Sequence, residues 1–184
     1  MRVMAGSARG TILHVPRSEL RPTMDVVKGA IFSSLQDLVP GARVLDLFAG
    51  TGSLGIEALS RGAEEVVFVE SDRRAGESIR KNLEKTRFDG HVHHGDVFSY
   101  LDRLATPASF DLIIADPPYA KYEGERDFTP ELLTNQALRL ALKPGGIFVL
   151  EHLPGKDLPS YAEWECFRDK RYGATAVAFL RSAS

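Results

Sequence analysis

Short apolar runs recur along the chain and alternate with segments whose apolar positions have helical spacing. Such runs are typical of strands buried on both faces, and apolar residues three or four positions apart are typical of one face of a helix. The pattern predicts strands at residues 43–48, 65–70, 91–95, 111–115 and 147–151. It predicts helices at residues 54–61, 73–87, 97–104 and 129–142. This alternation favours an α/β fold with a doubly wound, Rossmann-like parallel sheet.

The two ends of the chain depart from this alternation. Residues 163–170 and 175–181 are extended with no helix between them, which predicts an antiparallel C-terminal hairpin at the sheet edge. Residues 2–4 and 11–15 predict a small N-terminal hairpin. A helix is expected from Thr23 to about residue 38, with one apolar face formed by Val26, Val27, Ala30, Ile31 and Leu35. We therefore expect a hairpin extension at residues 1–22 and one domain at residues 23–184.

Composition limits the classes of protein that remain. The chain has 184 residues, 43% hydrophobic and 26% charged, as expected of one soluble domain. The formal net charge is -2, but residues 1–30 carry five basic and two acidic side chains, so this segment either meets an anionic partner or forms a solvated surface. A single cysteine, Cys166, excludes an internal disulfide, and we expect it and Trp164 to be packing residues. No apolar stretch predicts a membrane span or signal peptide, so we expect a cytoplasmic protein.

A G-x-G-x-x-G string runs from Gly50 to Gly55, between a predicted strand and a predicted helix. This string is typical of dinucleotide-binding loops, because its glycines let the backbone turn tightly and approach a ligand. Glu70 ends the next strand, where a carboxylate can accept hydrogen bonds from both ribose hydroxyls. A cofactor that contains a ribose is therefore indicated, and a tight turn without a ligand is the alternative.

Two carboxylates bear on the identity of this cofactor. Asp46 lies just before the loop, where its charge would repel a pyrophosphate and would suit a cofactor with an ammonium or sulfonium cation. Asp96 follows the third strand, where it either accepts a hydrogen bond from an adenine amino group or caps the next helix.

The segment Asp116-Pro117-Pro118-Tyr119 follows the fourth strand directly. Its prolines fix the backbone and remove two N–H groups, so the carbonyls are held rigidly at the carboxyl edge of the sheet, where ligands of such sheets bind. A carboxylate, fixed carbonyls and an aromatic ring together suit the exocyclic amino group of a flat base.

With the F-A-G-T-G loop, this segment resembles the S-adenosylmethionine-dependent class I methyltransferases that modify amino groups of nucleobases. Further motifs extend the resemblance over almost the whole chain: M-R-V-M-A-G-S-A-R-G at its start, L-R-P-T-x-D at residues 20–25, V-E-S-D at residues 69–72 and R-Y-G-x-T at residues 171–175. They are similar to the bacterial 16S rRNA (guanine-N2)-methyltransferase family of the RsmD type. Residues 25–29 read D-V-V-K-G, where that family usually reads D-R-V-R-E.

The resemblance implies a methyl transfer to guanine N2 in 16S ribosomal RNA, within the 30S particle or an assembly intermediate, by a monomer with S-adenosylmethionine as its cofactor. It assigns cofactor binding to Asp46, Phe48, Ala49, Gly50, Thr51, Gly52, Glu70, Ser71, Asp96 and Val97. It assigns catalysis to Asp116, Pro117, Pro118 and Tyr119. RNA contacts are expected from Arg9, Arg21, Lys28 and Arg171. No metal is expected, because a strand would divide His91 and His93 from His94.

Three other functions remain open at this point. A DNA adenine-N6 or cytosine-N4 methyltransferase shares the D-P-P-Y motif, but the chain has no room for a target-recognition domain. An NAD-dependent oxidoreductase would carry Tyr-x-x-x-Lys or a paired histidine and carboxylate for hydride transfer, and the sequence shows neither. A non-catalytic RNA-binding protein would not need an intact D-P-P-Y segment.

Overall fold

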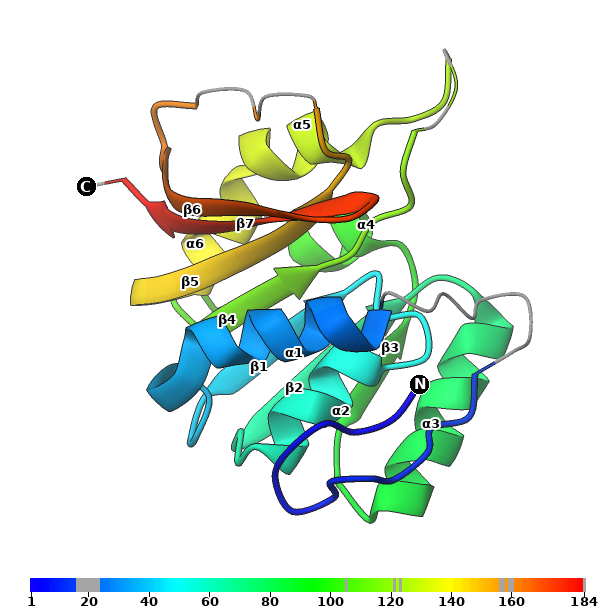
Figure 1. The fold of residues 1–184 in the computed structure, drawn as a ribbon. Coiled ribbons are helices and arrows are strands. Elements are labelled where there is room, and N and C mark those ends of the chain that lie inside the picture. The colour runs from blue at the N-terminus through cyan, green and yellow to red at the C-terminus, as the bar shows by residue number, and fades with distance from the viewer. Residues whose placement is uncertain are drawn as a thin grey trace.

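The computed structural model describes residues 1–15, 24–104, 106–120, 122, 124–155, 158 and 161–183. A seven-stranded sheet of order β3-β2-β1-β4-β5-β7-β6 runs through the molecule between two layers of helices (Figure 1). Its strands are β1 (Arg43–Leu47), β2 (Glu65–Glu70), β3 (His91–His94), β4 (Phe110–Ala115), β5 (Leu142–His152), β6 (Trp164–Tyr172) and β7 (Thr175–Ser182). Strands β1 to β5 are parallel, and β7 lies antiparallel between β5 and β6. The predicted fold class and C-terminal hairpin are confirmed.

Each face of the sheet is covered by its own helices and forms its own core. One face packs against α1 (Met24–Leu35), α2 (Ser53–Ser60) and α3 (Arg73–Thr86), and the 3₁₀ helix η2 (Gln36–Leu38) follows α1. The other face packs against α4 (Val97–Leu101), α5 (Phe128–Thr134) and α6 (Gln136–Ala141). Neighbouring strand residues such as Val44 and Leu45 therefore belong to different cores, which explains why the strands are apolar throughout.

The strand order reverses between β1 and β4, and this reversal determines where a ligand can bind. From β1 the chain proceeds to β2 and β3 on one side, and then returns to β4 on the other. Leu47 pairs with Ala115, so the loops that begin at Phe48 and Asp116 leave the sheet next to each other. Open α/β sheets bind ligands in the crevice at this switch point.

The structure corrects two predicted boundaries before and within β5. The single helix predicted at residues 129–142 is two helices, because Asn135 has an extended backbone (φ -75°, ψ 109°) and caps α6 with its own side chain. Strand β5 begins at Leu142 rather than residue 147. It includes Pro144 because the ladder between β4 and β5 is irregular there.

The N-terminal segment is fastened to the domain and makes less strand structure than predicted. A single bridge joins Arg2 and Ile12 in place of two strands. Val3 and Leu13 are buried and belong to the same hydrophobic core as residues of α2 and α3, so residues 1–15 pack as part of the domain. The division at residue 22 lies outside the described residues, as does the predicted cap Thr23.

Three side chains settle smaller predictions. Val26 is 67% exposed, so it does not belong to the buried face of α1, where Phe32 packs instead. Trp164 is buried, as predicted, whereas Cys166 is exposed on the edge strand β6. In the described part of the chain, no helix is long and apolar enough to cross a membrane.

Candidate functional site

The glycine loop after β1 adopts a backbone that most residues avoid. Gly50 and Gly52 have φ values of 54° and 78°, in the left-handed region that favours glycine. Phe48 also has a positive φ of 56°. No atom lies within 4 Å of the place where a Cβ of Gly50 would stand, so the loop is open on that side. A ligand can therefore approach this backbone closely.

Gly55, the last glycine of the string, has a different purpose. A Cβ at this position would lie 2.2 Å from Cε1 of Phe68, a buried residue of β2. Gly55 thus lets α2 pack closely against β2. The third glycine of the G-x-G-x-x-G string is therefore explained by the packing of α2 on β2, and it is this glycine that completes the match to a dinucleotide-binding loop.

Glu70 is held rigidly beside the glycine loop. Its Oε2 accepts the Gly50 N–H at 2.7 Å, and its Oε1 accepts the Asp72 N–H at 2.7 Å. Each carboxylate oxygen has a further lone pair, so the side chain can still accept two hydroxyl donors. The carboxylate fits a ribose at this position.

Asp46 lies beneath the loop rather than on its open side. It is 1% exposed and accepts the Gly55 N–H at 2.8 Å. Burial raises the pKa of Asp46 well above its usual value, and the charges of Asp116 and Glu70 raise it further. A cation close to Asp46 would relieve this cost, so the predicted role toward a sulfonium stays a prediction.

Asp96, which follows β3, caps α4, so the capping role predicted for it is confirmed. Its Oδ1 accepts the Ser99 N–H at 2.9 Å, at the N-terminus of α4. Val97 is buried and Ser71 is exposed. The contacts that these three residues would make with a cofactor remain predictions.

The Asp-Pro-Pro-Tyr segment leaves β4 beside the glycine loop. Asp116 is partly buried, Pro117 is buried and Pro118 is exposed. The Tyr119 hydroxyl donates to Oε1 of Glu151 at 2.7 Å and also contacts the Thr175 hydroxyl. Burial raises the pKa of Tyr119 above its usual value, and the negative charge of Glu151 raises it further.

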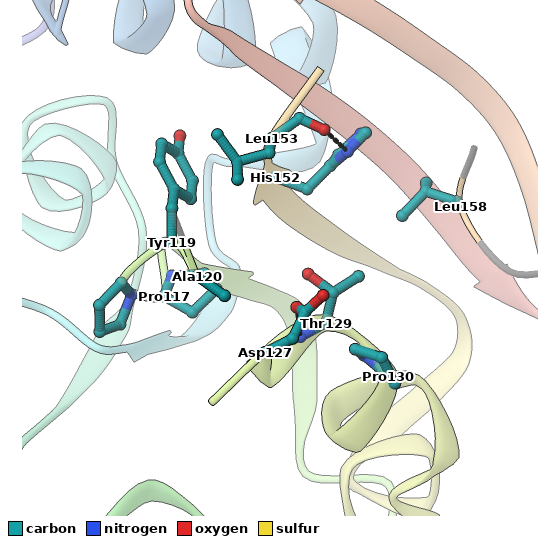
Figure 2. A pocket seen from close by; sticks show the side chains of 10 residues that line it. Pro117, Tyr119, Ala120, Asp127, Thr129, Pro130, His152, Leu153 and Leu158 are labelled. Carbon is teal, nitrogen blue, oxygen red and sulfur yellow. Dashed lines mark hydrogen bonds between the residues drawn. The ribbon is translucent and has the colours of Figure 1, made fainter. Parts of the chain in front are cut away.

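A pocket opens beside this segment (Figure 2). Its walls come from the D-P-P-Y segment, the start of α5 and the end of β5, with Leu158 at one side. The lining is largely apolar, and Asp127, Thr129 and His152 supply its polar side chains. Apolar walls with few polar groups suit a planar ring.

An aromatic cluster near the glycine loop was not predicted from the sequence. The rings of Phe48 and Phe128 lie 5.1 Å apart, and Phe98 stacks on Phe128 at 6.2 Å. The Arg126 guanidinium covers Phe98 and Phe128 at 5.1 and 4.7 Å and is held by Glu131. These residues come from the glycine loop, from α4 and from the start of α5 with the residues just before it, so no spacing in the sequence reveals the cluster.

The structure separates the four residues predicted to contact RNA. The prediction for Lys28 is wrong, because this side chain is 2% exposed and binds inside the protein. Arg9 is exposed in a turn fastened to Ser60, at the end of α2 that is remote from the glycine loop. Arg171 is exposed near Thr175, at the carboxyl edge of the sheet, and Arg21 lies outside the described residues.

The described residues contain no group of three histidine, cysteine or acidic side chains arranged to hold a metal ion.

The strand order, the glycine loop after β1 and the D-P-P-Y segment after β4 define a class I methyltransferase fold. The family described as "Conserved hypothetical protein 95" matches residues 1–181. The chain belongs to this family, the RsmD family.

Named relatives and solved structures agree with this assignment. Ribosomal RNA small subunit methyltransferase D of Haemophilus influenzae is 35% identical, over 99% of this chain and 94% of that protein. The protein of the same name from Escherichia coli K12 is 33% identical, over 96% of this chain and 87% of that protein. A hypothetical protein of Thermus thermophilus superposes with a TM-score of 0.82 at 32% identity, covering 98% and 99% of the two chains. The T. thermophilus 16S rRNA N2 G1207 methyltransferase RsmC was solved with AdoMet and guanosine. It superposes with a TM-score of 0.69 at 26% identity, covering 91% of this chain and 44% of that chain.

Proposed function

We propose that this protein methylates the exocyclic N2 amine of a guanine in 16S ribosomal RNA, with S-adenosylmethionine as the methyl donor. The observation that carries the proposal is the D-P-P-Y segment, which leaves β4 beside the glycine loop and forms one wall of the pocket. The names of the H. influenzae and E. coli relatives, and the AdoMet and guanosine in the RsmC structure, support the same reaction.

The residues around the glycine loop fit this cofactor. Gly50 leaves open space at the loop, and Glu70 is oriented by two backbone N–H groups to accept the ribose hydroxyls. We assign the methionine part to Asp46 and the backbone of residues 48–52, and the adenine to Asp96 and Val97, with Ser71 next to the ribose. When bound, S-adenosylmethionine supplies a methyl group on a sulfonium sulfur.

Asp116 and Pro117 prepare the amine for attack. The lone pair of an aromatic amine is delocalised into the ring, which makes the amine a poor nucleophile. Hydrogen bonds from its two hydrogens to the Asp116 carboxylate and the Pro117 carbonyl localise that lone pair and direct it. Fixed geometry of this kind supplies most of the rate enhancement. The methylated amine is strongly acidic, so it then loses its proton to Asp116 or to water.

Tyr119 holds the base by stacking on it. Stacking of a base on an aromatic side chain is worth about 1–3 kcal/mol. A paired guanine has to leave its helix before it can reach a site at the base of a pocket. The apolar walls beside Tyr119 accept such an extruded ring.

The partner in this proposal is 16S ribosomal RNA within the 30S particle or an assembly intermediate, and one copy of the chain acts alone in the cytoplasm. Arg171 and Arg9 are the exposed candidates for phosphate contacts. Their positions at opposite ends of the domain imply that only Arg171 contacts nucleotides next to the target.

Calorimetry and methyl transfer test the proposal together. We expect S-adenosylhomocysteine to bind and NAD not to bind. Labelled methyl groups should enter 30S particles from cells that lack the enzyme, and digestion to nucleosides should yield N2-methylguanosine. Binding of NAD alone would refute the cofactor assignment. Label in duplex DNA, with none in 16S rRNA or 30S particles, would refute the substrate.

A further inference from the structure

Apart from the phosphate contact proposed for Arg171, the R-Y-G-x-T segment at residues 171–175 has no role in the reaction described so far. It forms the turn between β6 and β7, where Gly173 has a φ of 63° and the Arg171 Nε donates to the Gly173 carbonyl at 3.0 Å. The turn delivers Thr175 to the start of β7, where its side chain is 6% exposed. The segment is therefore built to present one buried hydroxyl.

That hydroxyl meets two other side chains. Thr175 Oγ1 donates to Oε1 of Glu151 at 2.9 Å, and the same carboxylate oxygen accepts the Tyr119 hydroxyl at 2.7 Å. The Thr175 and Tyr119 hydroxyls are also in direct contact. The three residues come from the turn after β4, the end of β5 and the start of β7. The ring of Tyr119 is thus fixed at its far end by two strands that lie beside the pocket.

A second contact braces the same region. His152, the residue after Glu151, is 4% exposed and lines the pocket. Its Nε2 lies 3.1 Å from Oδ1 of Asp169 on β6, and its Nδ1 lies 3.1 Å from the Leu153 carbonyl. The C-terminal hairpin is therefore tied to the end of β5 at two consecutive residues.

We propose that Glu151 and Thr175 are positioning residues, which hold the Tyr119 ring by its hydroxyl so that its face is presented to the target base. This inference rests on the proposed function. Because the hydroxyl is engaged within the protein, the ring offers the base its face rather than its polar end. A ring fixed by Pro118 at one end and by Glu151 and Thr175 at the other loses little freedom when the base stacks on it.

A double-variant cycle tests this role in methyl transfer. We expect Tyr119→Phe and Thr175→Val each to lower the single-turnover rate on 30S particles about tenfold, while the affinity for S-adenosylhomocysteine stays unchanged. The double variant should lose little more than either single variant, because both changes break the same network. Thr175→Ser keeps the hydroxyl and should restore the rate. Thr86→Val, which removes a hydroxyl bonded to Asn82 in α3, is the matched control.

Two outcomes of this cycle would contradict the positioning role of Thr175. Multiplicative losses in the double variant, or a wild-type rate for Thr175→Val, would overturn the proposal. Glu151→Gln keeps the shape of the side chain and serves as the test variant should Thr175→Val fail to fold.

A measurement without substrate separates this inference from the proposed function. In protein with ¹³Cζ-labelled tyrosine, the Tyr119 signal, assigned with Tyr119→Phe, should stay in its protonated form to a higher pH than an ordinary phenol, because burial and the charge of Glu151 raise the pKa of Tyr119. Glu151→Gln removes a negative charge beside the hydroxyl and should therefore lower the pKa of Tyr119. A wild-type Tyr119 that titrates with the other tyrosines would refute the network. Failure of the wild type to methylate 30S particles, with this titration as expected, would refute the proposed function instead.

Discussion

Lys28 offers a sharp test of the structure, because the sequence predicts an RNA contact and the fold buries the side chain. Its Nζ donates to the Arg2 carbonyl at 2.7 Å and to Ser53 Oγ at 2.9 Å. The carboxylates of Asp25 and Glu57 each lie 3.7 Å from the same nitrogen. Lys28 therefore connects α1 to the N-terminal segment and to the start of α2. We expect Lys28→Met to break both connections and to destabilise the fold.

The size of the effect follows from these contacts. Hydrogen bonds from a charged donor contribute about 1.5–3 kcal/mol each, so the two bonds are worth about 3–6 kcal/mol. Burial lowers the pKa of Lys28 below its usual value, which means that part of this gain is already offset by desolvation. Removing the charge recovers that part. We expect Lys28→Met to lower the free energy of unfolding by about 3 kcal/mol.

Urea unfolding followed by circular dichroism measures this loss, and binding to 16S rRNA at several salt concentrations measures the RNA contact. Lys81→Met is the control, because Lys81 is an exposed lysine of α3. The variant Lys28→Met should be less stable than this control and should keep the wild-type salt dependence of RNA binding. A loss below about 1 kcal/mol together with a shallower salt dependence would show that Lys28 contacts phosphate, and the reasoning would be refuted.

Three further predictions concern packing, charge and reactivity. Gly55→Ala should lower the free energy of unfolding by about 1–3 kcal/mol, because the new Cβ would collide with Phe68. Gly29→Ala in α1 has open space around the new Cβ and should raise that free energy by about 0.5–1 kcal/mol. Urea unfolding of the two variants compares these effects. Folded Asp46 holds its proton more tightly than the unfolded chain, so stability should fall as the pH rises from about 4 through its raised pKa. Asp46→Asn should remove that fall and weaken S-adenosylhomocysteine binding in calorimetry. Cys166 should react with iodoacetamide at pH 8 more slowly than a free cysteine, because partial desolvation of its thiol on the exposed edge strand raises its pKa.

The sequence predicts the sheet well because the strands are buried on both faces. Their continuous apolar runs appear directly in the pattern, and β2 has the predicted bounds. The break between α5 and α6 depends on the backbone of Asn135, which helical spacing does not report. The early start of β5 depends on an irregular ladder with β4, a tertiary feature.

The candidate site was predictable only where its residues follow strands that are neighbours in the sheet. The glycine loop and Asp116 meet because β1 and β4 are neighbours at the switch point, a rule that applies to the whole fold class. Tyr119, Glu151 and Thr175 are far apart in the sequence and share no spacing pattern. Lys28 shows the reverse problem, because sequence reports its charge but not its burial.

The central claim is that Asp116 holds the guanine amine for attack rather than helping to bind the cofactor. Single-turnover methylation of 30S particles by Asp116→Ala, paired with calorimetry of S-adenosylhomocysteine, tests it most directly. We predict that the rate falls at least about 100-fold while the dissociation constant changes less than about threefold. A rate near that of the wild type, or a loss explained by weaker cofactor binding, would contradict the account.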